Sequence, residues 1–315
     1  MNSRQLQYFD AVLREGGFSA ASRKLNVAQP ALSGHIAALE AELGVKLFER
    51  TNKGVTPTSA GIRLGRHAEA ILRQLESARA DISGGDDSPS GEVMVALPLT
   101  AAYLLAAPLY ARVTRELPRV TLRIVEGLSF ESGDIMSSGR GDLGLVPNAA
   151  DIPNLEAVSL FHENLYLVGK WDGTSPRIGE VPLKQLPDYP LIQTHKRVVL
   201  RRAIEELAAA EGVRLTTSHE ITGLHVMYSM LEAGLGYAIM NWALLGSRWN
   251  MNVLAAWKII EPEARRTISL TWPKDRPMTD AVRAVRQILV EVLRDVVRDG
   301  RWPASEIALW DNDWL

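Results

Sequence analysis

Residues 18–50 read FSAASRKLNVAQPALSGHIAALEAELGVKLFER and predict a short helix, a tight turn and a longer helix that leads into a hairpin. Asn26 stands where a tight turn needs a residue that tolerates left-handed backbone geometry. The longer helix is expected from about Gln29, with Pro30 in its first turn, to Gly44, because glycine suits a C-terminal exit. The segment is therefore predicted to be a helix-turn-helix.

The longer helix is expected to have two unlike faces. Its buried stripe is apolar and recurs at steps of four, three and four residues: Leu32, Ile36, Leu39 and Leu43. Its outward face carries only small residues: Pro30, Gly34, Ala37 and Ala41. Gln29 and Ser33 lie on the shoulder of that face. Small residues there indicate close approach to a partner such as the major groove of DNA; the alternative is an alanine-rich helix that faces solvent.

The flanking segments complete a small domain. A first helix is predicted from apolar residues at helical spacing, and Gly16 ends it: Leu6, Phe9, Val12 and Leu13. Ser19 is placed to cap the short second helix. After the long helix, residues 45–57 form two extended runs around the turn signal Asn52-Lys53-Gly54. Lys46, Arg50 and Lys53 make this hairpin basic, so it is either a wing that grips DNA or merely a soluble hairpin.

Charge is unevenly distributed along the 315 residues. Residues 1–66 hold nine Lys and Arg against five Asp and Glu, whereas the rest holds 26 against 32. A basic head on an acidic body fits a nucleic-acid-binding head. The sequence has no cysteine, no apolar signal-peptide core and no run of about 18 apolar residues, so we expect a cytoplasmic protein without disulfides or membrane contact.

A long helix is predicted over residues 59–83, capped by Thr58 or Ser59. Its apolar positions alternate steps of four and three residues, as in a heptad seam: Leu64, Ala68, Ile71, Leu75, Ala78 and Ile82. Such a seam predicts dimerisation, which would set two reading heads at a fixed separation. The alternative is a helix that packs on its own chain.

Residues 84–91, GGDDSPSG, are predicted to be a linker, and an α/β domain is expected over residues 92–300. Strands are predicted near residues 92–97, 121–126, 142–146, 165–168, 191–193, 237–240 and 268–272. Helices are predicted near residues 100–116, 132–138, 198–211, 224–233 and 279–298. The alternation predicts βαβ units and a largely parallel sheet.

Several motifs resemble the LysR-type transcriptional regulator family over nearly the whole chain. The most specific are AQPALS at residues 28–33, LE at 39–40, ELGVKLFER at 42–50 and TPTSAG at 56–61, in the order that the family shows. Weaker matches are GDLGLV at 141–146 and AGLGYAI at 233–239. The resemblance implies a multidomain protein, with an all-α winged helix-turn-helix head (1–58), a dimerising linker helix (59–83) and a two-lobed α/β effector domain similar to periplasmic binding proteins. Lobe I is expected at about 92–164 and 267–300, and lobe II at about 165–266.

The resemblance also implies DNA contacts and partners. Gln29, Pro30 and Ser33 would contact base edges or the groove, and Arg50 and Thr58 the DNA backbone; Ser19, His35 and Lys53 complete the predicted DNA-binding set. Family members often carry Ser where this chain has Ala28 and a long polar residue where it has Gly34. Direct readout is therefore expected to be thin, with DNA shape contributing. Promoter DNA, further copies of the chain in a homodimer or homotetramer, and RNA polymerase are the implied partners.

A small effector is expected between the two lobes, where helix N-termini offer amide groups to an anion. The predicted contacts stand at strand-to-helix junctions: Pro98, Leu99, Thr100, Ser129, Thr194, His195 and Thr222. Each threonine could equally be an ordinary helix cap. The absence of Arg and Lys from these junctions favours an effector with few negative charges. A regulator of the same family that needs no effector is the alternative.

Other chemistry has little support. The six histidines show no metal-ligand spacing, and no catalytic or phosphate-binding motif occurs, so we expect no enzyme activity, metal or cofactor. A cytoplasmic solute-binding protein is a further alternative, which the basic head disfavours. The acidic tail, residues 301–315, carries Trp302, Trp310 and Trp314; these indoles are expected to dock on the protein or on a neighbouring subunit, the alternative being disorder.

Overall fold

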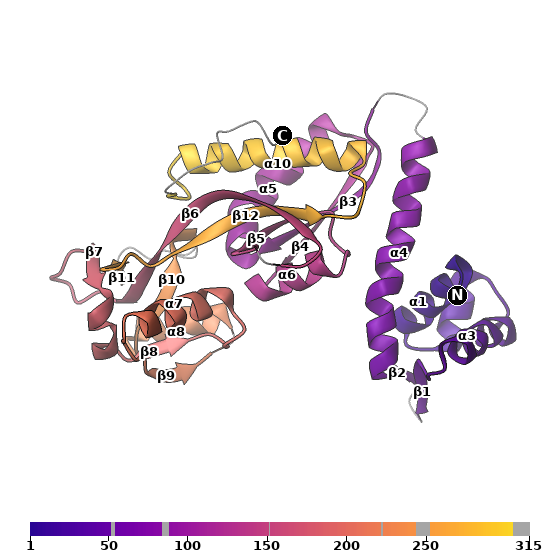
Figure 1. Ribbon diagram of the computed structural model, residues 1–315, viewed down its shortest axis with the longest axis horizontal. Coiled ribbons are helices and arrows are strands. Elements are labelled where there is room, and N and C mark those ends of the chain that lie inside the picture. Colours follow the sequence, from indigo (N-terminus) through magenta and orange to yellow (C-terminus); the bar gives the residue numbers. More distant parts are fainter. Residues whose placement is uncertain (52–53, 84–87, 151, 222, 244–252, 305–315) are drawn as a thin grey trace. The chain divides into compact units, whose positions relative to one another are not determined.

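The computed structural model describes residues 1–51, 54–83, 88–150, 152–221, 223–243 and 253–304 (Figure 1). Lys53, Thr222, Trp310 and Trp314 therefore lie outside the described residues. The chain forms two compact units, one of residues 1–91 with 138–140 and the other of the remaining residues. The described residues include no helix that is long and apolar enough to cross a membrane.

The head consists of three helices and a hairpin: α1 (Ser3–Glu15), α2 (Phe18–Leu25), α3 (Gln29–Leu43), β1 (Phe48–Thr51) and β2 (Gly54–Pro57). Asn2 caps α1 in a capping box with Gln5, and Asn26 ends α2 in the left-handed conformation that the sequence predicts. Gly44, with φ of 68°, ends α3 as expected. The first three positions of the predicted α3 stripe are buried in one core with α1 and the hairpin: Leu32, Ile36 and Leu39.

Two predictions about the head are wrong. Leu43 is 39% exposed, and Glu40 is buried instead, because its carboxylate accepts hydrogen bonds from the backbone nitrogens of Leu47 (2.9 Å) and Phe48 (3.3 Å). Ser19 does not cap α2: the helix begins at Phe18, with Gly17 at the cap position, two residues earlier than predicted. Ser19 therefore lies in the first turn, where its side chain is available for a contact with α3.

The linker helix α4 (Ser59–Ser83) packs against the head at its N-terminal end. Leu64 and Ala68, the first two residues of the predicted seam, belong to the core of the head. Gly61 permits this approach, since a Cβ there would lie 2.1 Å from the Leu47 carbonyl oxygen. Further along α4, Ile71, Leu75 and Ile82 are exposed. The first turns of the predicted seam are thus buried in the core of the head, whereas its later turns are exposed.

Lobe I of the second unit is a three-layer structure. It contains β3 (Gly91–Pro98), α5 (Leu99–Glu116), β4 (Val120–Gly127), α6 (Ser129–Ser137), β5 (Leu143–Pro147) and α10 (Asp280–Arg298). Alternation along β3 explains the layers: Val93, Val95 and Leu97 join the core with α5 and α10, whereas Ala96 faces the core with α6. Figure 1 shows α10 and α5 on one side of the strands and α6 on the other.

Lobe II is built around the C-terminal half of β6 (Leu155–Lys170). It contains β7 (Ile178–Pro182), the 3-10 helix η1 (Leu183–Asp188), β8 (Leu191–Gln193), α7 (Val199–Ala210), β9 (Thr217–Glu220), α8 (Leu224–Ala233), β10 (Ala238–Asn241) and β11 (Leu254–Ile260). Alternate residues of β6 again face two cores: Leu165 and Leu167 face α7 and η1, and Tyr166 and Val168 face α8. The long strand therefore serves both faces of lobe II.

The two lobes are joined by β6 and β12 (Arg265–Pro273), which run through one sheet in the order β4-β3-β5-β12-β6-β11-β7. These strands pair antiparallel with each other; β12 is also antiparallel to β5, and β6 to β10 and β11. The parallel pairs include β3 with β5 and β11 with β7. The prediction of a largely parallel sheet is thus wrong, because the crossover strands return directly between lobes without an intervening helix.

Trp302 follows α10 and is buried in the core of lobe I, as the tail hypothesis predicts for this residue. Its ring packs edge-on against Phe161 at a centroid distance of 5.2 Å. Its indole nitrogen donates a hydrogen bond of 2.8 Å to the Glu163 carboxylate on β6. Trp302 therefore holds the chain just after α10 against a crossover strand.

Candidate functional site

The head exposes the small face of α3. Pro30, Gly34, Ala37 and Ala41 are all exposed, as predicted, and Gln29 is exposed at the start of the helix. The Ser19 hydroxyl donates a hydrogen bond of 3.0 Å to Gln29 Oε1, which ties α2 to the first turn of α3. Ser33 is half-buried one turn further on. Four of the predicted DNA-contacting residues thus lie together around the N-terminus of α3: Ser19, Gln29, Pro30 and Ser33.

Other predicted DNA contacts have partners inside the head. His35 packs edge-on against Tyr8 of α1, with ring centroids 5.0 Å apart. The Thr58 hydroxyl donates to the Lys46 carbonyl oxygen (2.7 Å) and accepts from the Gly61 backbone nitrogen (3.0 Å), so it joins the hairpin to the start of α4. Arg50 pairs with Val55 across the hairpin through its backbone. The described hairpin therefore has a fixed position relative to α3 and α4.

Lys46 and Glu40 fix the junction between α3 and the hairpin. The Lys46 ammonium lies 2.6 Å from the Glu40 carboxylate. Burial acts to raise the pKa of Glu40, but hydrogen bonds from Lys46 and the two hairpin amides outweigh it and hold that pKa below its ordinary value. Glu40 is therefore an ionised, buried residue that holds the hairpin against α3, and its carboxylate partly neutralises the charge of Lys46.

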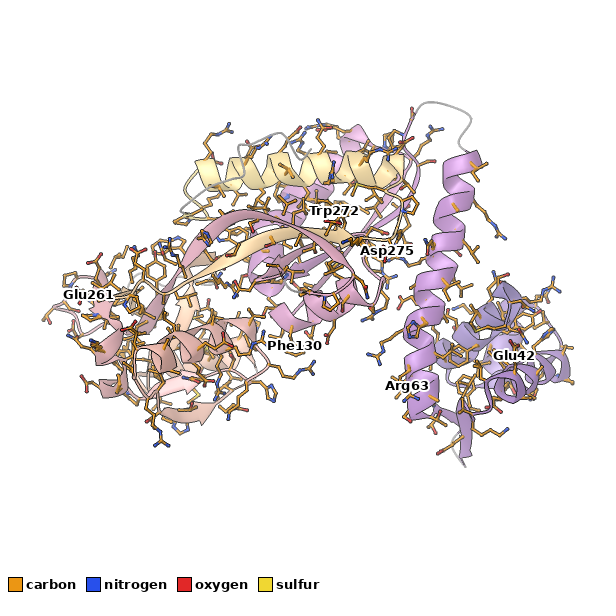
Figure 2. The ribbon with its side chains drawn as sticks, in the orientation of Figure 1. Glu42, Arg63, Phe130, Glu261, Trp272 and Asp275 are labelled. Atoms are coloured by element: carbon orange, nitrogen blue, oxygen red, sulfur yellow. The ribbon has the colours of Figure 1, made fainter. Side chains whose placement is uncertain are left out.

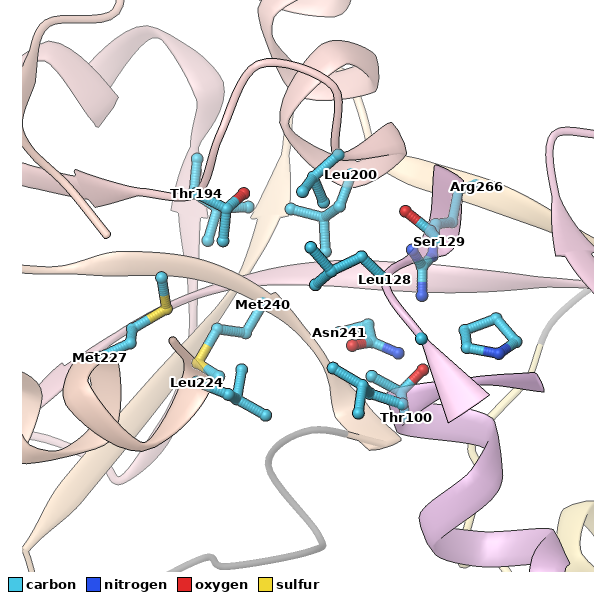
Figure 3. Close-up of a pocket in the computed structure, with 15 residues that line it drawn as sticks. Thr100, Leu128, Ser129, Thr194, Leu200, Leu224, Met227, Met240, Asn241 and Arg266 are labelled. Atoms are coloured by element: carbon cyan, nitrogen blue, oxygen red, sulfur yellow. The ribbon is translucent and has the colours of Figure 1, made fainter. Parts of the chain in front are cut away.

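A cavity of about 70 Å³ lies between the two lobes (Figure 3). Lobe I contributes the β3–α5 and β4–α6 junctions, and lobe II contributes the start of α7, α8 and the end of β10. The lining residues are Pro98, Leu99, Thr100, Gly127, Leu128, Ser129, Thr194, Val198, Leu200, Leu224, Met227, Ile239, Met240, Asn241 and Arg266. Small ligands of open α/β sheets bind in such crevices beyond the carboxyl ends of strands.

Five predicted effector contacts line this cavity: Pro98, Leu99, Thr100, Ser129 and Thr194. Thr100 is not a helix cap, because Pro98 occupies the cap position of α5. His195 does not line the cavity, since its side chain is exposed and its Nδ1 accepts a hydrogen bond from the Arg197 backbone nitrogen at 3.2 Å. The strand-to-helix junctions thus meet at one place, although not every polar residue in them faces it.

Ser129 links the two lobes. Its hydroxyl oxygen accepts a hydrogen bond of 3.1 Å from the Val199 backbone nitrogen, so it caps α7, whose own cap residue, Val198, makes no side-chain hydrogen bond. Nearby, Arg197 lies 3.2 Å from Asp134 and stacks over the Phe130 ring of α6 at 4.3 Å (Figure 2, which labels Phe130). These contacts hold the start of α7 against α6 beside the cavity.

Sequence reasoning missed the polar residues that come from the crossover region. Arg266 on β12 and Asn241 at the end of β10 both line the cavity and are buried. Each hydrogen-bonds Glu163 on β6, which is fully buried. A signal was present, because Glu163 and Arg266 occupy the same alternation as buried apolar residues, Phe161 and Leu165 in one strand and Ile268 and Leu270 in the other.

A second, smaller cavity adjoins the first. It has a volume of about 10 Å³ and is lined in part by Gln193, whose amide oxygen and nitrogen have no hydrogen-bond partner in the described structure. This volume fits one water molecule, which could satisfy both atoms. Among the described residues, no group of three or more His, Asp or Glu side chains could hold a metal ion.

Comparisons with known proteins agree with this architecture. The bacterial regulatory helix-turn-helix model of the lysR family matches residues 3–62, and the LysR substrate binding domain model matches residues 86–294. The nitrogen assimilation regulatory protein nac of Escherichia coli K12 is 27% identical over 304 residues, which cover 96% of this chain and 98% of that protein.

Solved structures share the fold. A full-length OxyR variant from Pseudomonas aeruginosa superposes with a TM-score of 0.69 at 22% identity, covering 93% of this chain and 95% of that one. Full-length CbnR in complex with its target DNA gives a TM-score of 0.64 at 24% identity, covering 94% and 99%. Head, linker helix and two-lobed domain thus all have counterparts, and the chain belongs to the LysR family of bacterial helix-turn-helix transcriptional regulators.

Proposed function

We propose that this regulator binds promoter DNA as a dimer, or as a pair of dimers, and that a small organic anion between its two lobes changes how it acts there. The DNA is read by the N-terminal end of α3, supported by the hairpin. RNA polymerase is the proposed partner through which DNA binding affects transcription. The observation that carries the effector role is the interlobe cavity, into which both lobes and a buried cation, Arg266, project.

The exposed face of α3 supports the DNA-reading role. Its small residues leave the helix backbone close to its surface, so α3 can enter the major groove deeply. Gln29, held by Ser19, and Ser33 then present amide and hydroxyl groups to base edges near the helix N-terminus. Pro30 lies between them, and His35 lies further along the same helix. Arg50, Lys53 and Thr58 are proposed to contact the DNA backbone.

The exposed part of α4 supports dimerisation. Ile71 and Leu75 are 37% and 39% exposed, and Ile82 is 87% exposed, although each is large and apolar. With Ala78, which is also exposed, they follow the four-and-three spacing of a coiled-coil seam. Leu64 and Ala68 are used by the head and contribute to the dimer indirectly, by fixing the direction in which α4 leaves it.

The cavity supports a single negative charge on the effector. Arg266 is the only Lys or Arg among the described residues that line it, and its Nε donates to Glu163. The rest of its guanidinium is available to bind one carboxylate. Thr100 supplies one hydroxyl group from the first turn of α5, and Thr194 supplies a second from lobe II. Lobe closure around such a ligand would shift the population between two arrangements of the effector domain.

The division of labour within the head can be tested on DNA. A binding sequence is first selected from a random library with the full-length protein, and affinities are then measured by fluorescence anisotropy at several salt concentrations. We expect Ser33→Ala to lower the preference for the selected sequence, by about 1–3 kcal/mol per lost base contact. Arg50→Ala is expected to weaken binding to selected and random DNA alike and to reduce the salt slope by about one.

Arg14→Ala provides the matched control. Arg14 is an exposed cation of the same head, but it pairs with Asp10 at 2.8 Å on α1 and lies away from α3 and the hairpin in sequence. It should leave both the preference and the salt slope unchanged. Equal losses on selected and random DNA for Ser33→Ala and Arg50→Ala would contradict the proposed roles.

A further inference from the structure

The polar end of the interlobe cavity is organised by one buried carboxylate, Glu163. It accepts hydrogen bonds from Arg266 Nε, from Asn241 Nδ2 at 2.9 Å and from Trp302 Nε1 at 2.8 Å. An ionised carboxylate can only accept hydrogen bonds, so all three partners must present donors to it. Glu163 therefore fixes the orientation of the two neighbours that line the cavity, Arg266 and Asn241.

Asn241 is left with an unsatisfied acceptor. Because its Nδ2 is committed to Glu163, the amide cannot be turned over, and its Oδ1 must point away from that carboxylate. Asn241 is fully buried, and Oδ1 has no hydrogen-bond partner in the described structure. Figure 3 shows the Asn241 amide beside Thr100, with the Arg266 guanidinium directed toward it. A ligand that fits this site must therefore bring a hydrogen-bond donor.

Charge decides which kind of donor fits. Arg266 offers its remaining N–H groups to an anion, whereas the described cavity lining contains no Asp or Glu. Glu163 already accepts hydrogen bonds from three donors. A ligand ammonium group would therefore be buried beside the positive charge of Arg266 with no protein carboxylate to pair with it. A neutral hydroxyl donates one hydrogen bond without that penalty. The complementary ligand thus carries a carboxylate and a hydroxyl.

Spacing and size restrict the ligand further. Arg266 and Asn241 bind the two oxygens of the same carboxylate, so the groups that they present to the cavity are close neighbours. A ligand whose carboxylate and hydroxyl groups are on adjacent carbon atoms could bind both of these neighbouring residues. At about 10–15 Å³ per water, the cavity holds roughly five to seven non-hydrogen atoms. Its other end is apolar, formed by side chains that favour a short aliphatic chain: Leu200, Leu224, Met227, Ile239 and Met240.

We propose that the effector is a small 2-hydroxy monocarboxylic acid with a short aliphatic chain. Its carboxylate binds Arg266 and the Thr100 hydroxyl, its hydroxyl donates to Asn241 Oδ1, and its chain lies among the methionines and leucines of lobe II. This inference rests on the proposed effector role of the cavity, and it narrows that role to one class of compound.

Titration calorimetry on the full-length protein tests the class, with both enantiomers of 2-hydroxybutyrate, with butyrate, with 2-aminobutyrate and with succinate. We expect one enantiomer of 2-hydroxybutyrate to bind at least tenfold more tightly than butyrate, because butyrate leaves Asn241 Oδ1 buried and unpaired. The amino acid and the dicarboxylate are expected to bind more weakly still. Equal binding of butyrate, or tighter binding of 2-aminobutyrate or succinate, overturns the inference.

Two variants separate this inference from the effector role itself. Asn241→Ala removes the acceptor, so the ratio between 2-hydroxybutyrate and butyrate should fall toward one. Thr100→Val keeps the shape of the side chain and should weaken both acids by the same factor, which preserves the ratio. If Asn241→Ala fails to fold, the ratio of the affinities for 2-hydroxybutyrate and butyrate, measured in the unaltered protein and in Thr100→Val, still tests the proposed class of effector.

The remaining outcomes are also informative. If another class of acid binds and Thr100→Val weakens it, the cavity is an effector site and only the proposed class is wrong. If no acid binds while the protein still recognises its selected DNA, both the class and the effector role are overturned, and the DNA-reading proposal stands.

Discussion

Trp302→Phe should destabilise the effector-binding unit strongly, although the residue lies after the last described helix. Trp302 is only 1% exposed, and its indole both packs edge-on against Phe161 and donates a 2.8 Å hydrogen bond to Glu163. Phenylalanine retains an aromatic ring in that place but removes the donor. Glu163 would then keep two of its three hydrogen bonds and remain fully buried.

The expected loss follows from two contributions. A hydrogen bond to a charged group contributes about 1.5–3 kcal/mol, and a buried carboxylate that loses a partner cannot recover it from water. The phenyl ring is smaller than indole by three non-hydrogen atoms, and their loss from a fully buried site adds about 1–3 kcal/mol. We therefore expect the free energy of unfolding to fall by about 3–6 kcal/mol.

Tryptophan fluorescence during urea denaturation can measure this change in the intact protein. All eight tryptophans lie beyond residue 170, so the signal reports the effector-binding unit and not the head. Trp171→Phe is the matched control, because Trp171 is half-buried and its indole donates at 2.8 Å to a neutral carbonyl, that of Ser175. It should cost about 0.5–1.5 kcal/mol. If Trp302→Phe costs no more than Trp171→Phe, the anchoring of Trp302 through Glu163 is refuted.

Three further predictions concern the head and the linker helix. Glu40→Gln should lower the free energy of unfolding of the head by about 1–2 kcal/mol at neutral pH, measured from core methyl resonances in urea. Because the pKa of Glu40 is depressed in the folded head, the ionised carboxylate stabilises the head above about pH 4.3, and this stabilisation is lost as the pH falls through the folded pKa. The variant should show no such loss of stability at low pH. Leu75→Asp should weaken self-association at least tenfold in sedimentation velocity, whereas Gln74→Asp, at a residue that is also exposed but lies off the seam, should not; equal effects would count against the seam. Gly61→Ala should lower the free energy of unfolding of the head by about 1–3 kcal/mol, because the new Cβ would lie 2.1 Å from a carbonyl oxygen. Gly34→Ala, whose Cβ would have no atom within 4 Å, should instead stabilise the head by up to about 1 kcal/mol. The reverse order in the same urea experiment would contradict the close approach of α4.

Local signals in the sequence predicted the head well. The spacing of Leu32, Ile36 and Leu39, the left-handed Asn26 and the exit at Gly44 all depend on residues within one or two turns, and the structure confirms them. The prediction that Leu43 is buried was wrong because the next element changes the periodic pattern. The backbone amides of Leu47 and Phe48 hydrogen-bond the Glu40 carboxylate, so Glu40 is buried and Leu43 is exposed.

The cavity could be predicted only in part. Thr100 and Ser129 stand at strand-to-helix junctions that sequence patterns indicate, whereas the strand Leu254–Ile260 was missed altogether. Arg266 lies 103 positions from Glu163, and Asn241 lies 78 positions from it. A pairing over such separations leaves no local periodic signal beyond a polar residue at a buried position of a strand. The polar residues that line the cavity from the crossover region were therefore not predicted, although the strand-to-helix junctions that meet there were.

The position of Glu163 also explains how a ligand could act on more than its own cavity. Its carboxylate holds Asn241 of lobe II, Arg266 of a crossover strand and Trp302, which packs in the core of lobe I. An anion that binds Arg266 adds a second negative charge beside Glu163 and competes for the same guanidinium. The strength of all three hydrogen bonds then depends on whether the cavity is filled. Because a ligand shifts a conformational equilibrium only through contacts that differ between the two states, this shared carboxylate supplies such a difference to both lobes at once.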